Sequence, residues 1–279
     1  MSGLEDERRE VLDSRDLSRL AALLAAHPEL ATTPMAPWAD HPRGADVLGY
    51  LAMLRFGAPL DLPGTGAAAK ALIDAGAPVD GHPGDRETPL ITAASYGDAE
   101  VAAVLIEAGA DVNVVSAPNS GGVPSGTPLQ HAAVYGMTEV LDLLVTAGAR
   151  IDRFEMAAAA GDISAWPLHR FPAQTRMRAL VFAADHQRLE VIDQLVAAGT
   201  PVNKPDAEWQ RLALHTAAGN GRVAGVQRML AHRADPNLVD PLYHRTPLGF
   251  CMAGDRHGNS ASHSEVANIL RPLTASVAE

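Results

Sequence analysis

The chain has 279 residues, a formal net charge of −11 at pH 7, and only 4% aromatic residues. The negative charge argues against nucleic acid and anionic membranes as partners, because most of the surface would repel phosphate groups. The single cysteine excludes an internal disulfide and favours a reducing, cytoplasmic location. The first ten residues lack the apolar core of a secretory signal, and no apolar run approaches the roughly 18 residues of a membrane-spanning helix.

Residues 1–30 carry leucines at helical spacing and predict a helix pair that ends at His27-Pro28. A proline-rich connector follows in residues 31–44. A second helix pair is predicted in residues 45–80, and it ends at Gly76. From Gly76 to Gly109 the step is 33 residues.

One sequence pattern occurs twice between residues 85 and 149. Each copy opens with Thr-Pro-Leu, at residues 88–90 and 127–129. The threonine hydroxyl can accept a hydrogen bond from a free amide of the first turn, and proline is tolerated at the first helical position. The small pairs Ala93-Ala94 and Ala132-Ala133 let a second helix pack closely, and the glycines at 97, 109, 136 and 148 suit helix ends.

These residues resemble the ankyrin repeat family, whose unit of about 33 residues is a helix pair with a projecting turn. The resemblance implies an all-α solenoid of stacked antiparallel helix pairs with projecting turns, and one domain over residues 1–279. The repeats are expected at 45–80, 85–113, 126–152, 154–174 (irregular), 176–203 and 208–237, with capping units at 1–30 and 243–273. The Ala, Gly, Arg and Pro bias with little Lys suggests a bacterial source.

Three insertions interrupt the repeat period. Residues 114–123 are rich in Pro, Asn, Ser and Gly, and residues 166–174 replace a usual turn after a fifth unit too short for a full second helix. A third insertion covers residues 254–263. The sequence leaves open whether these loops are ordered lids.

The repeat register sorts side chains by face and predicts a row along a concave groove. His215 holds the structural position of the Leu-His-x-Ala-Ala pattern and is expected to belong to the scaffold, whereas His131 lies one place later, at a groove position. The predicted groove row comprises Thr92, Ser95, Tyr96, His131, Val134, Tyr135, Met156, Phe182, Asp185, His186, Thr216, Asn220 and Phe250, and Trp166 joins it as a predicted binding residue.

Other motifs point to structural roles. Gly64-Thr65-Gly66 begins a glycine pattern of dinucleotide-binding type but lacks the preceding strand that such a site needs. The eleven histidines show no metal-binding spacing, so no metal and no cofactor are expected. Cys251 occupies a small buried position of the repeat and is expected to be structural.

Two functions follow. The first is a binding protein that holds a protein partner in its groove and on its turn tips, without turnover. The alternative is a small-molecule-binding protein or enzyme whose inserted loops close a pocket for dehydration, cyclisation or isomerisation of an organic substrate. In that case His131 or His186 would be the acid or base, Asp185 a second base, and Tyr96 or Tyr135 a hydrogen-bond donor. Family base rates favour the first function.

Overall fold

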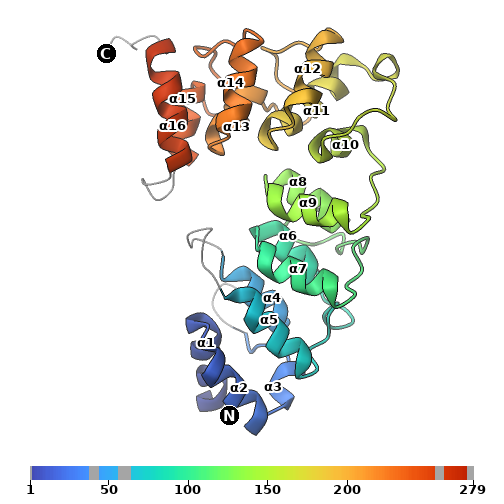
Figure 1. Cartoon of the computed structure of the whole chain (residues 1–279), viewed down its shortest axis with the longest axis vertical. Helices are drawn as coiled ribbons and strands as arrows, with labels where there is room; N and C mark the ends of the chain where they lie inside the picture. The colour runs from blue at the N-terminus through green and yellow to red at the C-terminus, as the bar shows by residue number, and fades with distance from the viewer. Residues whose placement is uncertain (1, 38–43, 56–63, 255–260, 275–279) are drawn as a thin grey trace. The chain divides into compact units, whose positions relative to one another are not determined.

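The computed structural model describes residues 2–37, 44–55, 64–254 and 261–274 (Figure 1). The chain divides into two compact units, Met1–Arg150 and Ile151–Glu279, which are described separately below. Within the described ranges the secondary structure is helical, apart from an isolated β-bridge between Met35 and Ala45. The predicted all-α class is therefore confirmed.

The first unit is a stack of helix pairs. Neighbouring pairs pack through their first helices, α4 on α6 and α6 on α8, and through their second helices, α5 on α7 and α7 on α9. Its helices are α1 (Ser2–Ser14), α2 (Leu17–Ala26), α3 (Glu29–Thr32), α4 (Val47–Met53), α5 (Thr65–Asp74), α6 (Pro89–Tyr96), α7 (Ala99–Glu107), α8 (Pro128–Val134) and α9 (Thr138–Thr146).

Helices α6 and α8 begin as the Thr-Pro-Leu pattern predicts. The Thr88 hydroxyl accepts a hydrogen bond from the Ile91 amide, at 3.4 Å. Thr127 does the same for Gln130, whose side chain accepts in return from the Thr127 amide and completes a capping box. Each cap contributes about 1 kcal/mol to helix stability. The alanine pairs of both helices are fully buried, so the second helices can approach closely.

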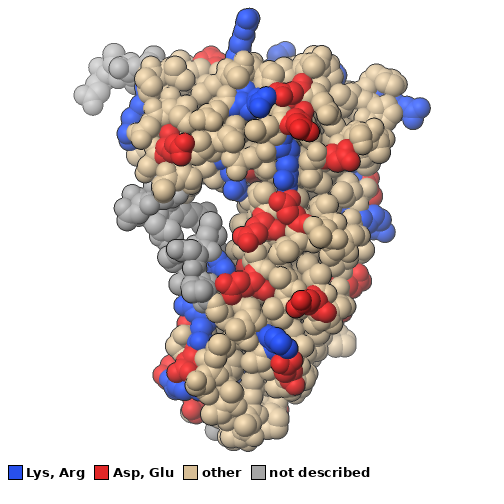
Figure 2. Space-filling model, viewed as in Figure 1, with Lys and Arg blue, Asp and Glu red and all other residues tan. Residues whose placement is uncertain are grey.

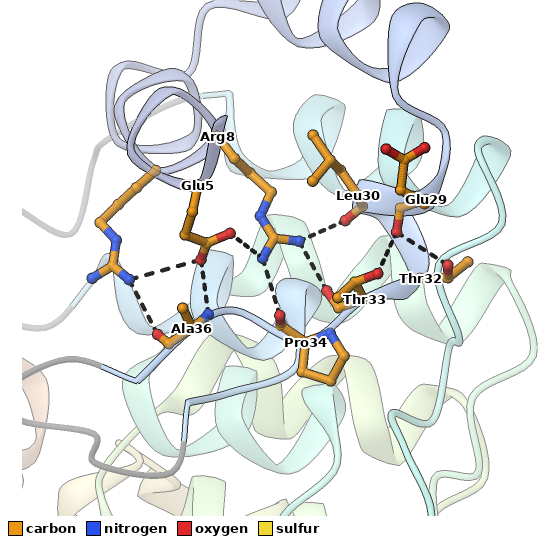
Figure 3. Close-up of polar contacts among 9 residues, drawn as sticks. Glu5, Arg8, Glu29, Leu30, Thr32, Thr33, Pro34 and Ala36 are labelled. Carbon is orange, nitrogen blue, oxygen red and sulfur yellow. Dashed lines mark hydrogen bonds and ion pairs between the residues drawn. The ribbon is translucent and has the colours of Figure 1, made fainter. Parts of the chain in front are cut away.

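A buried arginine ties the N-terminal helix to the connector that follows α3 (Figure 3). Arg8 donates from Nη1 to the carbonyls of Leu30 and Thr33, both at 2.8 Å, and from Nη2 to Pro34 and Glu5. The Glu5 carboxylate also accepts from the Ala36 amide, at 2.8 Å. Arg8 therefore supplies donors to carbonyls that have no helical partner at the end of α3.

A carboxylate from the next repeat occupies the glycine-rich start of α5. Glu100 accepts from the amides of Gly64 and Gly66, each at 3.0 Å, and from the Thr65 hydroxyl. A helix N-terminus favours a negative charge, and here the protein provides its own. These contacts support a structural role for Gly64-Thr65-Gly66 over dinucleotide binding.

The second unit repeats the helix-pair plan with one interruption. Its helices are α10 (Phe154–Ala160), η1 (Leu168–Arg170), α11 (Ala173–Asp185), α12 (Leu189–Ala197), α13 (Ala213–Gly219), α14 (Val223–Ala231), α15 (Pro247–Gly254), α16 (Ala261–Leu270) and η2 (Arg271–Leu273). Helix α11 begins at Ala173, directly after Pro172, three residues before the start expected from the repeat register. Helix α16 likewise begins inside the predicted 254–263 insertion, of which residues 255–260 lie outside the described ranges.

Aromatic side chains stand where α10 lacks a second helix, as the short fifth unit predicts. The rings of Phe154 and Phe171 stack with centroids 4.2 Å apart, and Trp166 packs on both at about 6 Å. Phe154 is buried by this cluster. The 166–174 segment therefore covers the end of the core instead of projecting from it.

Candidate functional site

The inserted loop of the first unit is folded onto the repeats. The Ser116 amide donates to the Gly126 carbonyl at 2.9 Å, and the Ser116 hydroxyl donates to the Val123 carbonyl at 2.8 Å. The Ala117 amide reaches back to the Arg86 carbonyl, at 2.8 Å, in the turn before α6. These hydrogen bonds anchor residues 114–126, which we call the inserted loop, over the start of α8.

His131 on α8 lies beneath the inserted loop and is fully buried. Its Nε2 is 3.1 Å from the Val123 carbonyl, and its Nδ1 is 2.8 Å from the Ser95 hydroxyl. A carbonyl can only accept, so Nε2 carries the proton, and in the neutral ring Nδ1 accepts from Ser95. Burial lowers the pKa of His131 to about 4, although the hydrogen bond to Val123 acts in the opposite direction. The low pKa keeps the ring neutral near pH 7.

Gly122 brings the loop backbone into direct contact with the histidine. A Cβ at this position would lie 2.8 Å from His131 Cε1 and 3.4 Å from the Tyr135 hydroxyl. A larger residue here would have to displace the His131 ring or the loop backbone. The register placed His131 on an open groove, and the structure buries it because the inserted loop covers that position.

Two tyrosines and a glutamate lie beside the buried histidine. Tyr96 and Tyr135 occupy equivalent places near the ends of α6 and α8, and Tyr135 is 41% exposed, with its ring centroid 6.4 Å from that of His131. Burial raises the pKa of Tyr96, and the neighbouring Glu87 and Tyr135 raise it further. We call the surface formed by Glu87, Tyr96 and Tyr135 the tyrosine surface.

Glu87 is held in place by the inserted loop. Its carboxylate is hydrogen-bonded to the Gly122 amide and the Ser120 side chain. Burial raises the pKa of Glu87, and the two hydrogen bonds oppose that shift. The loop thus fixes both the buried His131 and the carboxylate beside Tyr96.

The predicted acidic and basic groups of the second unit belong to its interior. Asp185 is buried at the end of α11 and accepts from the Asn220 side-chain amide at 2.8 Å, with Arg222 Nε 3.4 Å away. His186 is also buried. The register expected both on the groove, but both are buried, and Asn220 and Arg222 from the turn before α14 cover Asp185.

The other predicted site residues fall into two groups by exposure. Phe182 packs edge-on against Trp209, and Phe250 lies between His215 and Tyr243. His215 is buried and donates to the Leu238 carbonyl at 2.9 Å, as expected of a scaffold position. Buried residues are Thr92, Met156 and Phe182; half-buried or exposed residues are Ser95, Val134, Trp166, Thr216, Asn220 and Phe250.

Sequence reasoning missed an apolar group on the second unit. Leu242 and Tyr243 lie on the turn before α15, with Tyr243 66% exposed, and Val239 and Met252 are also exposed. The sequence feature that could have indicated these exposed apolar residues is the Pro-Leu-Tyr run at 241–243, in a turn where polar residues are usual. Glu87 and Ser120 were missed too, because their roles depend on where the inserted loop folds.

A surface hollow of about 250 Å³ lies in the second unit, where Ala160 and Gly161 meet residues 188–191. None of the predicted catalytic residues lines it.

Among the described residues no group of three or more His, Cys, Asp or Glu side chains could hold a metal ion. Cys251 is buried, with its thiol 3.2 Å from the His263 carbonyl. No helix within the described ranges is long and apolar enough to cross a membrane.

Comparison with known proteins agrees with the repeat pattern. A family model for three copies of the ankyrin repeat matches residues 64–155, and a single ankyrin repeat model matches residues 210–241. No curated protein matches the chain. Among solved structures, the human ASB11 ankyrin repeat domain is 19% identical, with 93% of this chain and 95% of that one covered and a TM-score of 0.43. The two matched segments, and the capped helices α6 and α8 in the first of them, show that the chain contains ankyrin repeats.

Proposed function

We propose that this chain is a binding protein that holds a protein partner on its tyrosine surface, without turnover. The observation that carries the proposal is the exposure of Tyr135 next to Tyr96 and Glu87, on an ankyrin scaffold. Tyrosine is enriched at the centres of protein interfaces, because it combines a large apolar ring with a polar hydroxyl. The inserted loop adds a fixed rim to this surface.

The burial of the predicted acid–base groups supports binding over turnover. His131 is fully buried and neutral, and both ring nitrogens are engaged by protein groups. Asp185 and His186 are buried in the other unit. A general acid or base must come within hydrogen-bond reach of its substrate, so the enzymatic alternative has less support.

Photocrosslinking tests the proposal. Tyr135 is replaced with a photoreactive phenylalanine, and Leu17 on α2 serves as a matched control, since its 42% exposure is close to the 41% of Tyr135. In cells of the source organism, position 135 should crosslink a discrete protein that position 17 does not capture. Equal capture at both positions, or none at 135, would refute the proposal. The cytoplasmic location and bacterial source remain predictions from the sequence.

A further inference from the structure

We infer that the segment bound by the tyrosine surface is basic, an extended stretch of the partner rich in Lys or Arg. The inference rests on the proposed function and adds the chemistry of the partner. It comes from the distribution of charge along the chain and from the residues that form the tyrosine surface.

The negative charge of the chain belongs entirely to the first unit. Residues 1–150 hold 20 of the 33 acidic residues and 9 of the 22 basic ones, whereas residues 151–279 hold 13 of each. The formal charge of −11 is therefore that of the first unit, and the second unit is neutral. A field of one sign attracts an oppositely charged partner and speeds its association.

Most of the excess of acidic over basic residues lies in the repeats that carry the tyrosine surface. Residues 65–149 contain ten acidic residues and only two basic ones, Lys70 and Arg86. Lys70 pairs with Asp74 on its own helix, at 3.0 Å. Four of these acidic residues lie on α7 and α9, the second helices of the two repeats: Glu100, Glu107, Glu139 and Asp142. Figure 2 shows acidic side chains in separate patches on the face that it presents. A basic segment would approach this unit through an attractive field.

The tyrosine surface also offers the short-range contacts that a cation prefers. Tyrosine ring faces attract Lys and Arg side chains, and a neighbouring carboxylate can pair with the same charge. Glu87 lies beside Tyr96 and is fixed by the inserted loop, so the carboxylate does not have to be ordered when the partner binds. Two rings on adjacent repeats suit successive side chains of one extended segment.

The apolar group on the second unit does not share this character. Leu242, Tyr243, Val239 and Met252 are exposed on a unit with no net charge. Tyr243 therefore provides a matched control: it is an exposed tyrosine of the same scaffold, without the surrounding negative field.

Fluorescence anisotropy with the full chain tests the inference. The probe is a labelled peptide of about twelve residues that alternates Lys and Arg with Gly and Ser, and its neutral counterpart carries Gln in place of each Lys and Arg. The basic peptide should bind at least about tenfold more tightly than the neutral one at about 50 mM salt, and several-fold more weakly at about 300 mM. The Tyr96→Leu/Tyr135→Leu double variant should bind the basic peptide about three- to tenfold more weakly, while Tyr243→Leu should bind as the unaltered chain does.

Two results would overturn the inference. One is equal affinity for the basic and neutral peptides; the other is undiminished binding of the basic peptide by the double variant. The proposed function has its own test: it fails if position 135 crosslinks no protein, or crosslinks no more than position 17 does. A protein crosslinked there whose capture the basic peptide does not compete away would leave the proposed function standing and contradict the basic segment.

Discussion

Replacing His131 with alanine should destabilise the protein strongly, by an amount that depends on pH. The change empties a fully buried site and removes the hydrogen bonds that the His131 ring makes with the Val123 carbonyl and the Ser95 hydroxyl. Truncating a buried ring and losing its two hydrogen bonds costs about 3 kcal/mol near neutral pH.

The pH dependence follows from the pKa of His131, which is about 4 when folded and 6.5 for an unperturbed histidine. Because the folded pKa is lowered, the unfolded state binds the proton first, and stability falls as pH falls from about 6.5 to about 4. This loss reaches about 2 kcal/mol by pH 5 and about 3 kcal/mol by pH 4. Alanine cannot titrate, so the difference in stability between the protein and the variant should shrink toward zero near pH 4.

Urea unfolding followed by far-UV circular dichroism, at about pH 7 and about pH 5, measures both effects. Comparison with the variant cancels the titration of other groups, including His215, whose pKa is also lowered by burial. A free energy of unfolding within about 0.5 kcal/mol of that of the unaltered chain at pH 7 would contradict the burial of His131, because a surface residue gives that result.

Three further changes test other contacts of the first unit. Gly122→Ala should cost about 1–3 kcal/mol in urea unfolding, because its Cβ would clash with the His131 ring, whereas Gly121→Ala meets nothing within 4 Å and should change stability by less than about 0.5 kcal/mol. Arg8→Met should lower the free energy of unfolding by about 3–5 kcal/mol, because three carbonyls and a glutamate lose a buried donor; an equal loss for a surface arginine would refute this. Glu100→Gln should cost about 1–2 kcal/mol and expose the amides at the start of α5 to faster hydrogen exchange; unchanged exchange there would contradict the carboxylate's role.

The fold was predictable because each repeat carries its own local signals. The caps at Thr88 and Thr127 and the buried alanine pairs are set by residues a few positions apart, so the sequence alone identifies them. The ends of the irregular parts were less predictable. Helix α11 begins three residues early because Pro172 provides a suitable N-terminal flank.

The site was only partly predictable, because exposure depends on long-range contacts. The register correctly put Tyr96 and Tyr135 at equivalent places, but it could not show that the inserted loop would fold back over His131. It also treated Asp185 as a surface group, although Asn220, from the next repeat, hydrogen-bonds to its carboxylate. In both cases the contact that decides burial comes from residues whose position the repeat pattern does not specify.

Thermal unfolding of the full chain in fractionated extract of the source cells shows whether a protein partner binds the tyrosine surface. A partner that binds only the folded state adds about 2.7 kcal/mol at about 100 times its Kd, which raises the midpoint measurably. The macromolecular fraction should raise the unfolding midpoint of the unaltered chain but not that of the Tyr96→Leu/Tyr135→Leu variant. A rise produced by the low-mass filtrate alone, or an equal rise for the variant, would contradict binding of a protein partner on the tyrosine surface.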